Sequence, residues 1–187
     1  MGDVHVPCIH CLIVLTSDGD RILAKYYDKR AYEDQTKTEA TFHKKTKHGK
    51  YGQDCDVFLH DGEVIVHRGG TDCKFFLSST QDENELILTN TLDCIVDTLS
   101  HLFHGQLDHR TILDNLELVL LCIDEVIDHG QIMELDPVAV QNRVVMRSSD
   151  VQGGQQPIGD LSISQALHLA KGQFQGFLSG NRNADGY

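Results

Sequence analysis

The residues best suited to chemistry in this sequence are Cys8 and Cys11, which flank His10. A Cys-x-x-Cys pair can supply half of a tetrahedral zinc site or form a redox dithiol when it lies in a loop or at a helix start. Here the pair leads directly into the apolar run 12–15, which is typical of a β-strand, and residues three apart on a strand point to opposite faces. We therefore expect both cysteines to be packing residues. A metal or thiol enzyme that uses Cys8 and Cys11 is the alternative from another class of function.

Other signatures of catalysis or metal binding are missing from the sequence. It contains no second Cys-x-x-Cys, no Gly-x-Ser-x-Gly, no Walker loop, no Gly-x-Gly-x-x-Gly and no His-Glu-x-x-His. The segment 17–20 begins like a calcium-binding loop, but the apolar residues Ile22 and Ala24 follow at ligand positions. The 11 histidines do not cluster at ligand spacing. The sequence therefore predicts a protein that is not an enzyme, with no metal site and no cofactor.

The composition limits the partners of the chain. Of 187 residues, 16 are Lys or Arg and 28 are Asp or Glu, so the formal net charge is −12. This acidic excess repels phosphate backbones and anionic lipid headgroups, which predicts no nucleic-acid binding and no direct membrane insertion. The sequence has no signal-peptide pattern and no apolar run of about 18 residues, and its 6 cysteines are scattered. We expect a cytoplasmic protein with reduced thiols.

The first half of the chain has the pattern of a β-sheet interrupted by one helix. Residues 11–16 and 21–27 are β-rich and enclose Asp18-Gly19, which predicts a hairpin with a type I′ turn. Residues 31–47 are compatible with a helix that is exposed on one face. Three more strands with short turns between them form an antiparallel meander over residues 57–60, 63–67 and 73–78.

The second half is predicted to be helical. Thr80-Gln81-Asp82-Glu83 has the pattern of a capping box and precedes apolar residues at helical spacing as far as residue 103. Asp108 is a candidate N-cap for a second helix that continues to Ile127 and ends at His129-Gly130. Asp136-Pro137 marks the start of a short third helix.

The order of elements predicts an α+β domain with one antiparallel sheet flanked by helices, β-β-α-β-β-β-α-α, and a C-terminal helical appendage. Ser162-Ile163-Ser164-Gln165 is a second capping-box pattern, and it opens the last predicted helix. We expect the domain to cover 9–135, a helical extension to cover 136–178 and a disordered tail to cover 179–187.

Several stretches of the sequence carry a resemblance to a known family: Ser17–Asp28, Glu83–Leu88, Asp97–Ser100, Arg110–Glu117 and Cys122–Pro137. They resemble the zeta subunits of coatomer. The order of the stretches agrees with that family from about residue 9 to residue 178. The family is similar to the sigma chains of clathrin adaptors, and the resemblance implies their longin-like fold, a five-stranded antiparallel sheet between helices. The Asp-Pro pair that ends the last stretch favours zeta over sigma.

The resemblance implies a non-catalytic small subunit of the coatomer (COPI) vesicle coat. Such a chain pairs with the trunk of the gamma subunit, joins the remaining coatomer chains and has an indirect link to an Arf-family GTPase. It takes part in Golgi-to-ER and intra-Golgi transport, in the cytoplasm and as a peripheral component of Golgi membranes and COPI vesicles. The alternative within membrane traffic is an adaptor sigma chain that binds dileucine sorting peptides.

Two apolar stripes are the candidate partner surfaces, because they exceed what a small sheet needs to cover itself. The alternative is that both stripes complete the core of the domain itself. The first stripe is nearly apolar all round, and the second lies on the last predicted helix. The residues that we expect to contact a partner are Leu116, Val119, Leu120 and Ile123 in the first stripe and Ile163, Leu167, Phe174 and Phe177 in the second.

Overall fold

The computed structural model describes residues 8–28, 34–47 and 55–151, with side chains as far as residue 147. The chain divides into two compact units, 1–146 and 147–187, and the first contains the sheet and nearly all of the described helices. The last predicted helix and the tail lie outside the described residues. Within the described part of the chain, no helix is long and apolar enough to cross a membrane.

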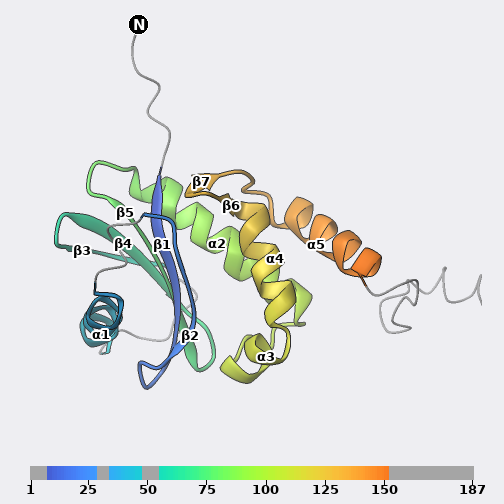
Figure 1. Ribbon diagram of the computed structural model, residues 1–187, viewed down its shortest axis with the longest axis horizontal. Helices are drawn as coiled ribbons and strands as arrows, with labels where there is room; N and C mark the ends of the chain where they lie inside the picture. Colours follow the sequence, from blue (N-terminus) through green and yellow to red (C-terminus); the bar gives the residue numbers. More distant parts are fainter. Residues whose placement is uncertain (1–7, 29–33, 48–54, 152–187) are drawn as a thin grey trace, which may run out of the picture. The chain divides into compact units, whose positions relative to one another are not determined.

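A five-stranded antiparallel sheet forms the centre of the first unit (Figure 1). Its strands, in the spatial order β2-β1-β5-β4-β3, are β1 (Ile9–Thr16), β2 (Arg21–Tyr26), β3 (Asp56–His60), β4 (Glu63–Gly69) and β5 (Cys73–Thr80). Strands β1 and β5 lie at the middle of the sheet, and nearly all their residues are buried. The apolar run 11–15 of β1 is typical of a strand covered on both faces, whereas β5 combines Phe75, Phe76 and Leu77 with buried polar residues. The antiparallel sheet predicted from the sequence is confirmed.

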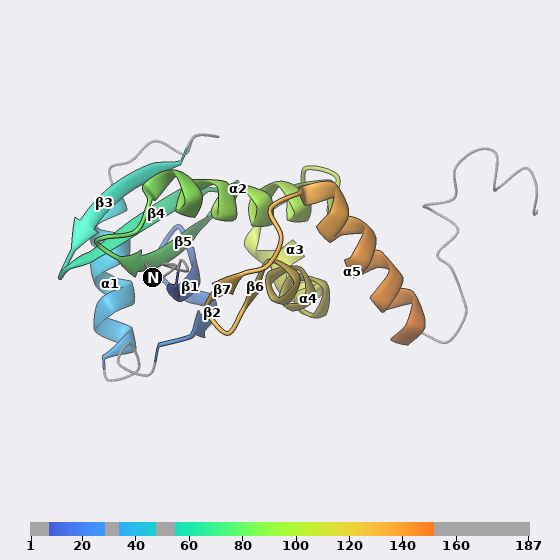
Figure 2. The same cartoon turned by 90° about the horizontal axis from the view of Figure 1, so that it is seen from above.

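Helices cover both faces of this sheet (Figures 1 and 2). Helix α1 (Gln35–Thr46) packs on one face, where Phe42 is buried against Phe76 of β5 with ring centroids 5.6 Å apart. Lys74 of β5 also holds this helix, since its Nζ donates a hydrogen bond to the carbonyl of Thr46 at 2.5 Å. The opposite face is covered by α2 (Glu85–Leu102), α3 (His109–Asp114) and α4 (Leu116–Val126).

The predicted capping box at Thr80 is wrong. Thr80 is still paired with Glu63 in the sheet, so its side chain is too early in the chain to cap α2. The helix is capped by Asn84 instead, whose side chain accepts a hydrogen bond from the backbone N–H of Leu86 at 2.9 Å.

The second predicted helix begins where the sequence indicated but is broken in the middle. Asp108 caps α3 by accepting a hydrogen bond from the N–H of Thr111 at 2.8 Å. The predicted continuous helix is wrong at Asn115, which has φ −123° and ψ 32° and divides α3 from α4. The Asn115 side chain donates to the carbonyl of Thr111 at 2.9 Å, a local bond that competes with helix continuation.

The turns differ from the prediction in one case. Asp61 and Gly62, between β3 and β4, have φ values of +49° and +79°, as a two-residue type I′ turn requires. The type I′ turn predicted at Asp18-Gly19 is wrong, because only Gly19 has a positive φ, +96°. The last pair of this hairpin is Leu15 with Arg21, so the connection consists of residues 16–20 and is longer than a two-residue turn.

A second, short hairpin follows α4 and was not predicted. It consists of β6 (Ile127–Asp128) and β7 (Gln131–Ile132), joined by His129 and Gly130 with φ values of +48° and +81°. The carbonyl of Gly130 accepts a hydrogen bond from the N–H of Ile9 at 2.7 Å, so this hairpin holds the start of β1. Helix α5 (Pro137–Val151) then begins at the predicted Asp136-Pro137 signal, and its Val140 and Val144 complete the core beside α2 and α4.

We predict that Gly130→Ala destabilises the protein by about 3 kcal/mol, combining a strained positive φ with overpacking. A Cβ at this position would lie 2.7 Å from the carbonyl oxygen of Ile9 and 3.2 Å from Cβ of Tyr27. Gly62→Ala is the matched control, because Gly62 has a similar φ and no heavy atom within 4 Å of an added Cβ. It should cost about 1 kcal/mol. Urea unfolding of both variants measures the difference, and equal losses would contradict this packing of β1.

Candidate functional site

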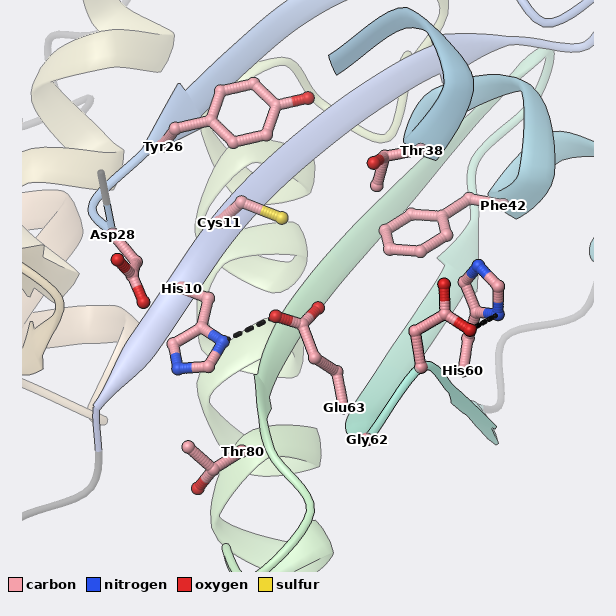
Figure 3. Close-up of a pocket in the computed structure, with 11 residues that line it drawn as sticks. His10, Cys11, Tyr26, Asp28, Thr38, Phe42, His60, Gly62, Glu63 and Thr80 are labelled. Atoms are coloured by element: carbon pink, nitrogen blue, oxygen red, sulfur yellow. Dashed lines mark hydrogen bonds and ion pairs between the residues drawn. The ribbon is translucent and has the colours of Figure 1, made fainter. Parts of the chain in front are cut away.

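A cavity of about 400 Å³ lies at one end of the sheet, on the face that α1 covers (Figure 3). Four parts of the sheet contribute to the cavity: the start of β1, the end of β2, the β3–β4 turn and the end of β5. Helix α1 lines the opposite side of the cavity with Thr38 and Phe42. Eleven side chains or backbones line it: His10, Cys11, Tyr26, Asp28, Thr38, Phe42, His60, Asp61, Gly62, Glu63 and Thr80.

A β-bulge places His10 in this cavity. Ile9 pairs with Ser79 and Cys11 pairs with Ser78, so His10 is an extra residue in β1. The bulge changes the alternation of the strand: Ile9 packs on the α2 side, whereas His10 and Cys11 both face the cavity on the α1 side. The carbonyl of His10 accepts hydrogen bonds from the N–H groups of Tyr27 and Asp28, at 2.8 and 3.2 Å. These two bonds hold the backbone of the bulged residue.

His10 forms a hydrogen bond with Glu63 across the central strand. Nδ1 of His10 lies 2.7 Å from Oε1 of Glu63, and the two side chains are 9% and 32% exposed (Figure 3). An ionised carboxylate can only accept hydrogen bonds, so the proton between the two atoms lies on Nδ1. When the imidazole is neutral, Nε2 is then an acceptor.

Tyr26 and Phe42 contribute aromatic rings to the lining, and each is held by a residue outside the cavity. The hydroxyl of Tyr26 donates a hydrogen bond to Glu39 of α1 at 2.8 Å, and Arg21 contacts the same carboxylate at 2.5 Å. Burial, together with the neighbouring Glu39, raises the pKa of Tyr26, so the hydroxyl stays a donor. Phe42 is almost fully buried and packs on Phe58 with ring centroids 5.9 Å apart.

The charge of the lining is negative. Asp28, Asp61 and Glu63 contribute carboxylates, whereas none of the described residues that line the cavity is Lys or Arg. His60 lies with Nδ1 3.4 Å from Asp61 at the β3–β4 turn. The arrangement therefore presents hydrogen-bond acceptors beside aromatic rings, which suits a cationic ligand group.

The two cysteines singled out from the sequence do not form a pair. Cys8 is exposed, and its backbone N–H donates to Glu83 at 3.2 Å. Cys11 is buried, with Sγ 3.0 Å from Oγ of Ser78, and burial raises the pKa of its thiol to about 12. A thiol with such a pKa stays protonated at neutral pH and is a poor nucleophile. In the described ranges of the chain, no group of three or more His, Cys, Asp and Glu side chains is placed to hold a metal ion.

The first stripe of predicted partner contacts is divided between core and surface. Val119 and Ile123 are fully buried in the chain's own core between the sheet and the helices, while Leu116 and Leu120 are partly exposed on α4. Leu113 of α3 precedes this stripe in the sequence and is 50% exposed. It was not among the predicted contacts. The second stripe, with Ile163, Leu167, Phe174 and Phe177, lies outside the described residues. The partner role of both stripes stays a prediction.

Further apolar surface on α5 and the segment before it was missed. The side chains exposed there are Met133, Leu135, Val138, Val145 and Met146. Apolar spacing identified a helix after Pro137 but did not say which of its residues would face the core. The His10–Glu63 pair was also missed, because the two residues are 53 positions apart and a bulge leaves no periodic signal.

Comparison with known proteins decides the family. The model of the clathrin adaptor complex small chain family matches residues 8–151. Coatomer subunit zeta-1 of Bos taurus is 34% identical to this chain over 167 residues, which cover 89% of this chain and 90% of that protein. The chain belongs to the coatomer zeta subunits. Coatomer subunit zeta-2 of Arabidopsis thaliana is 29% identical to this zeta-family chain over 173 residues, covering 91% of it and 95% of that protein.

Comparison of structures agrees on the fold. A chain in a homology model of the full-length AP-3 complex in a stretched open conformation superposes on this zeta-family chain with a TM-score of 0.60. The match covers 77% of this chain and 96% of that chain, at 13% sequence identity. At this identity the likeness concerns the fold alone. The longin-like sheet implied by the sequence resemblance is confirmed.

The two cysteines should differ in reactivity towards iodoacetamide at neutral pH. We expect alkylation of the exposed Cys8 in the native full-length chain, and reaction of Cys11 at least about a hundredfold more slowly, since it must wait for opening of the sheet. Cys122, whose pKa is raised to about 12 by burial, serves as a second protected thiol. Peptide mass spectrometry measures each site, and unfolded protein should react at all 6 cysteines. Rapid native labelling of Cys11 would favour the thiol-enzyme alternative.

Proposed function

We propose that this chain is the non-catalytic small subunit of a COPI coat and pairs with the trunk of the gamma subunit. The observation that carries the proposal is the 34% identity to coatomer subunit zeta-1 over 89% of this chain and 90% of that protein. An adaptor sigma chain that binds dileucine peptides is less well supported, since the curated relatives named above are coatomer zeta subunits.

The partly exposed face of α4 supports a role in assembly. Leu116 and Leu120 lie one helical turn apart and are only half-buried, and Leu113 precedes them on α3 with half of its surface exposed. Val119 and Ile123 pack in the core beneath them, so they fix the helix that carries this surface. A partner chain that covers the exposed side chains would remove apolar area from water.

The cellular setting follows from the same family role. The chain acts in the cytoplasm and on Golgi membranes and COPI vesicles as part of the complete coatomer, which an Arf-family GTPase recruits. It contributes to Golgi-to-ER and intra-Golgi transport. Its net charge of −12 disfavours contact with anionic lipid, so other chains supply the membrane-facing surface.

The domain boundaries are part of the proposal. Residues 9–135 form the small-subunit domain, 136–178 a helical extension and 179–187 a tail. The extension begins with α5, where Val138 and Met146 are exposed, 57% and 66%, while Val140 is buried against the domain. We expect this helix and the apolar stripe 163–178 to add a second contact with partner chains.

The test is co-expression of the full-length chain with the gamma trunk. We expect the two chains to copurify in equal amounts and the doubly substituted Leu116→Lys/Leu120→Lys chain to bind at least about tenfold more weakly, because charges would enter an apolar contact. Size-exclusion chromatography and calorimetric titration measure the association.

Two further variants make this test specific. Leu113→Lys changes a more exposed apolar site, on the preceding helix α3, and should weaken binding without loss of folding. Leu59→Lys is the matched control, since Leu59 is 54% exposed on the edge strand β3. A wild-type chain that stays monomeric beside the gamma trunk would refute the proposed pairing.

A further inference from the structure

We propose that the cavity between α1 and the end of the sheet binds the basic side chain, lysine or arginine, of a peptide segment. This site lies on the face of the sheet opposite to α4 (Figure 1). It is therefore independent of the proposed pairing through α4, and the two proposals can fail separately.

The size of the cavity suits an organic group. Its volume of about 400 Å³ lies within the range of ligand pockets, about 300–1,000 Å³. A bare metal ion would need several ligands at about 2 to 2.5 Å from one point, and no described group of three His, Cys, Asp or Glu side chains offers them. The extended side chain of lysine or arginine fills more of such a cavity.

The chemistry of the lining selects a cation. Glu63 uses Oε1 to bind His10, and its second carboxylate oxygen is a further acceptor at the centre of the cavity (Figure 3). Asp61 adds a carboxylate at the β3–β4 turn, where its side chain is 86% exposed. The described lining offers no Lys or Arg that would neutralise these carboxylates or attract an anion. An ammonium or guanidinium group satisfies acceptors of this kind with charge-assisted hydrogen bonds.

His10 makes the central acceptor rigid. The bulge places the imidazole on the cavity side of the sheet, and its Nδ1–H donates a hydrogen bond to Oε1 of Glu63 at 2.7 Å. The neutral ring then offers Nε2 as an additional acceptor. Tyr26 and Phe42 contribute ring surfaces to the same cavity, and a cation near an aromatic face gains further stabilisation. Such a cation–aromatic contact occurs among the described residues of this chain, where Nζ of Lys45 lies 5.3 Å from the centroid of the Phe58 ring.

The experiment is an NMR titration of the full-length chain with Nα-acetyl-arginine amide and Nα-acetyl-lysine amide. We expect at least one of them to shift the imidazole resonances of His10 in a saturable way. Nα-acetyl-citrulline amide has almost the shape of the arginine compound without its charge, and we expect it to bind at least about tenfold more weakly. Failure of both basic compounds to bind, or equal binding of the citrulline compound, would overturn the proposal.

Substitutions locate the binding at this cavity. Glu63→Gln keeps the shape and removes the charge, and we expect it to weaken binding about tenfold. Asp61→Asn retains a residue that tolerates positive φ and should weaken binding about twofold, since its carboxylate is largely exposed. Glu117→Gln, on an exposed position of α4, is the control and should leave binding unchanged. Equal effects of Glu63→Gln and Glu117→Gln would show that the cations bind only through net charge.

Discussion

The burial of β1 and β5 on both faces is the constraint on which the rest of the structure depends. These central strands pair along almost their whole length, and their apolar side chains alternate between two cores. Leu12 and Val14 need cover from α2 and α4, whereas Ile13 and Leu15 need cover from α1. The polar helix α1 therefore has to supply Phe42 to the core on one face of the sheet, while the apolar helices α2 and α4 pack on the other face.

A single inserted residue converts the end of this sheet into a candidate binding site. Without the bulge at His10, strict alternation would place that side chain on the opposite face from Cys11. With it, His10 and Cys11 share the α1 face, the imidazole meets Glu63, and the strand keeps Ile9 in the larger core. The site is thus a consequence of register rather than of any motif.

Much of the fold was predictable because local signals agreed with the final packing. The strands, the helix start at Asp108 and the helix start at Pro137 follow from periodicity and capping, which act over a few residues. The errors at Thr80 and Asn115 have different causes: Thr80 is kept in the sheet by pairing with Glu63, whereas the Asn115 side chain forms a local bond to Thr111 that competes with helix continuation. The unpredicted β6–β7 hairpin is stable because it pairs with the start of β1, more than a hundred residues away in sequence.

The sequence by itself determined the class of fold, the absence of known catalytic motifs, the acidic charge and the family, since these depend on composition, periodicity and residue identity. The tertiary structure alone decided which apolar residues of α4 stay exposed and that His10 contacts Glu63 from 53 positions away. The physical reason is that strand register and helix rotation are set by packing between distant segments, and periodicity within one segment does not record them.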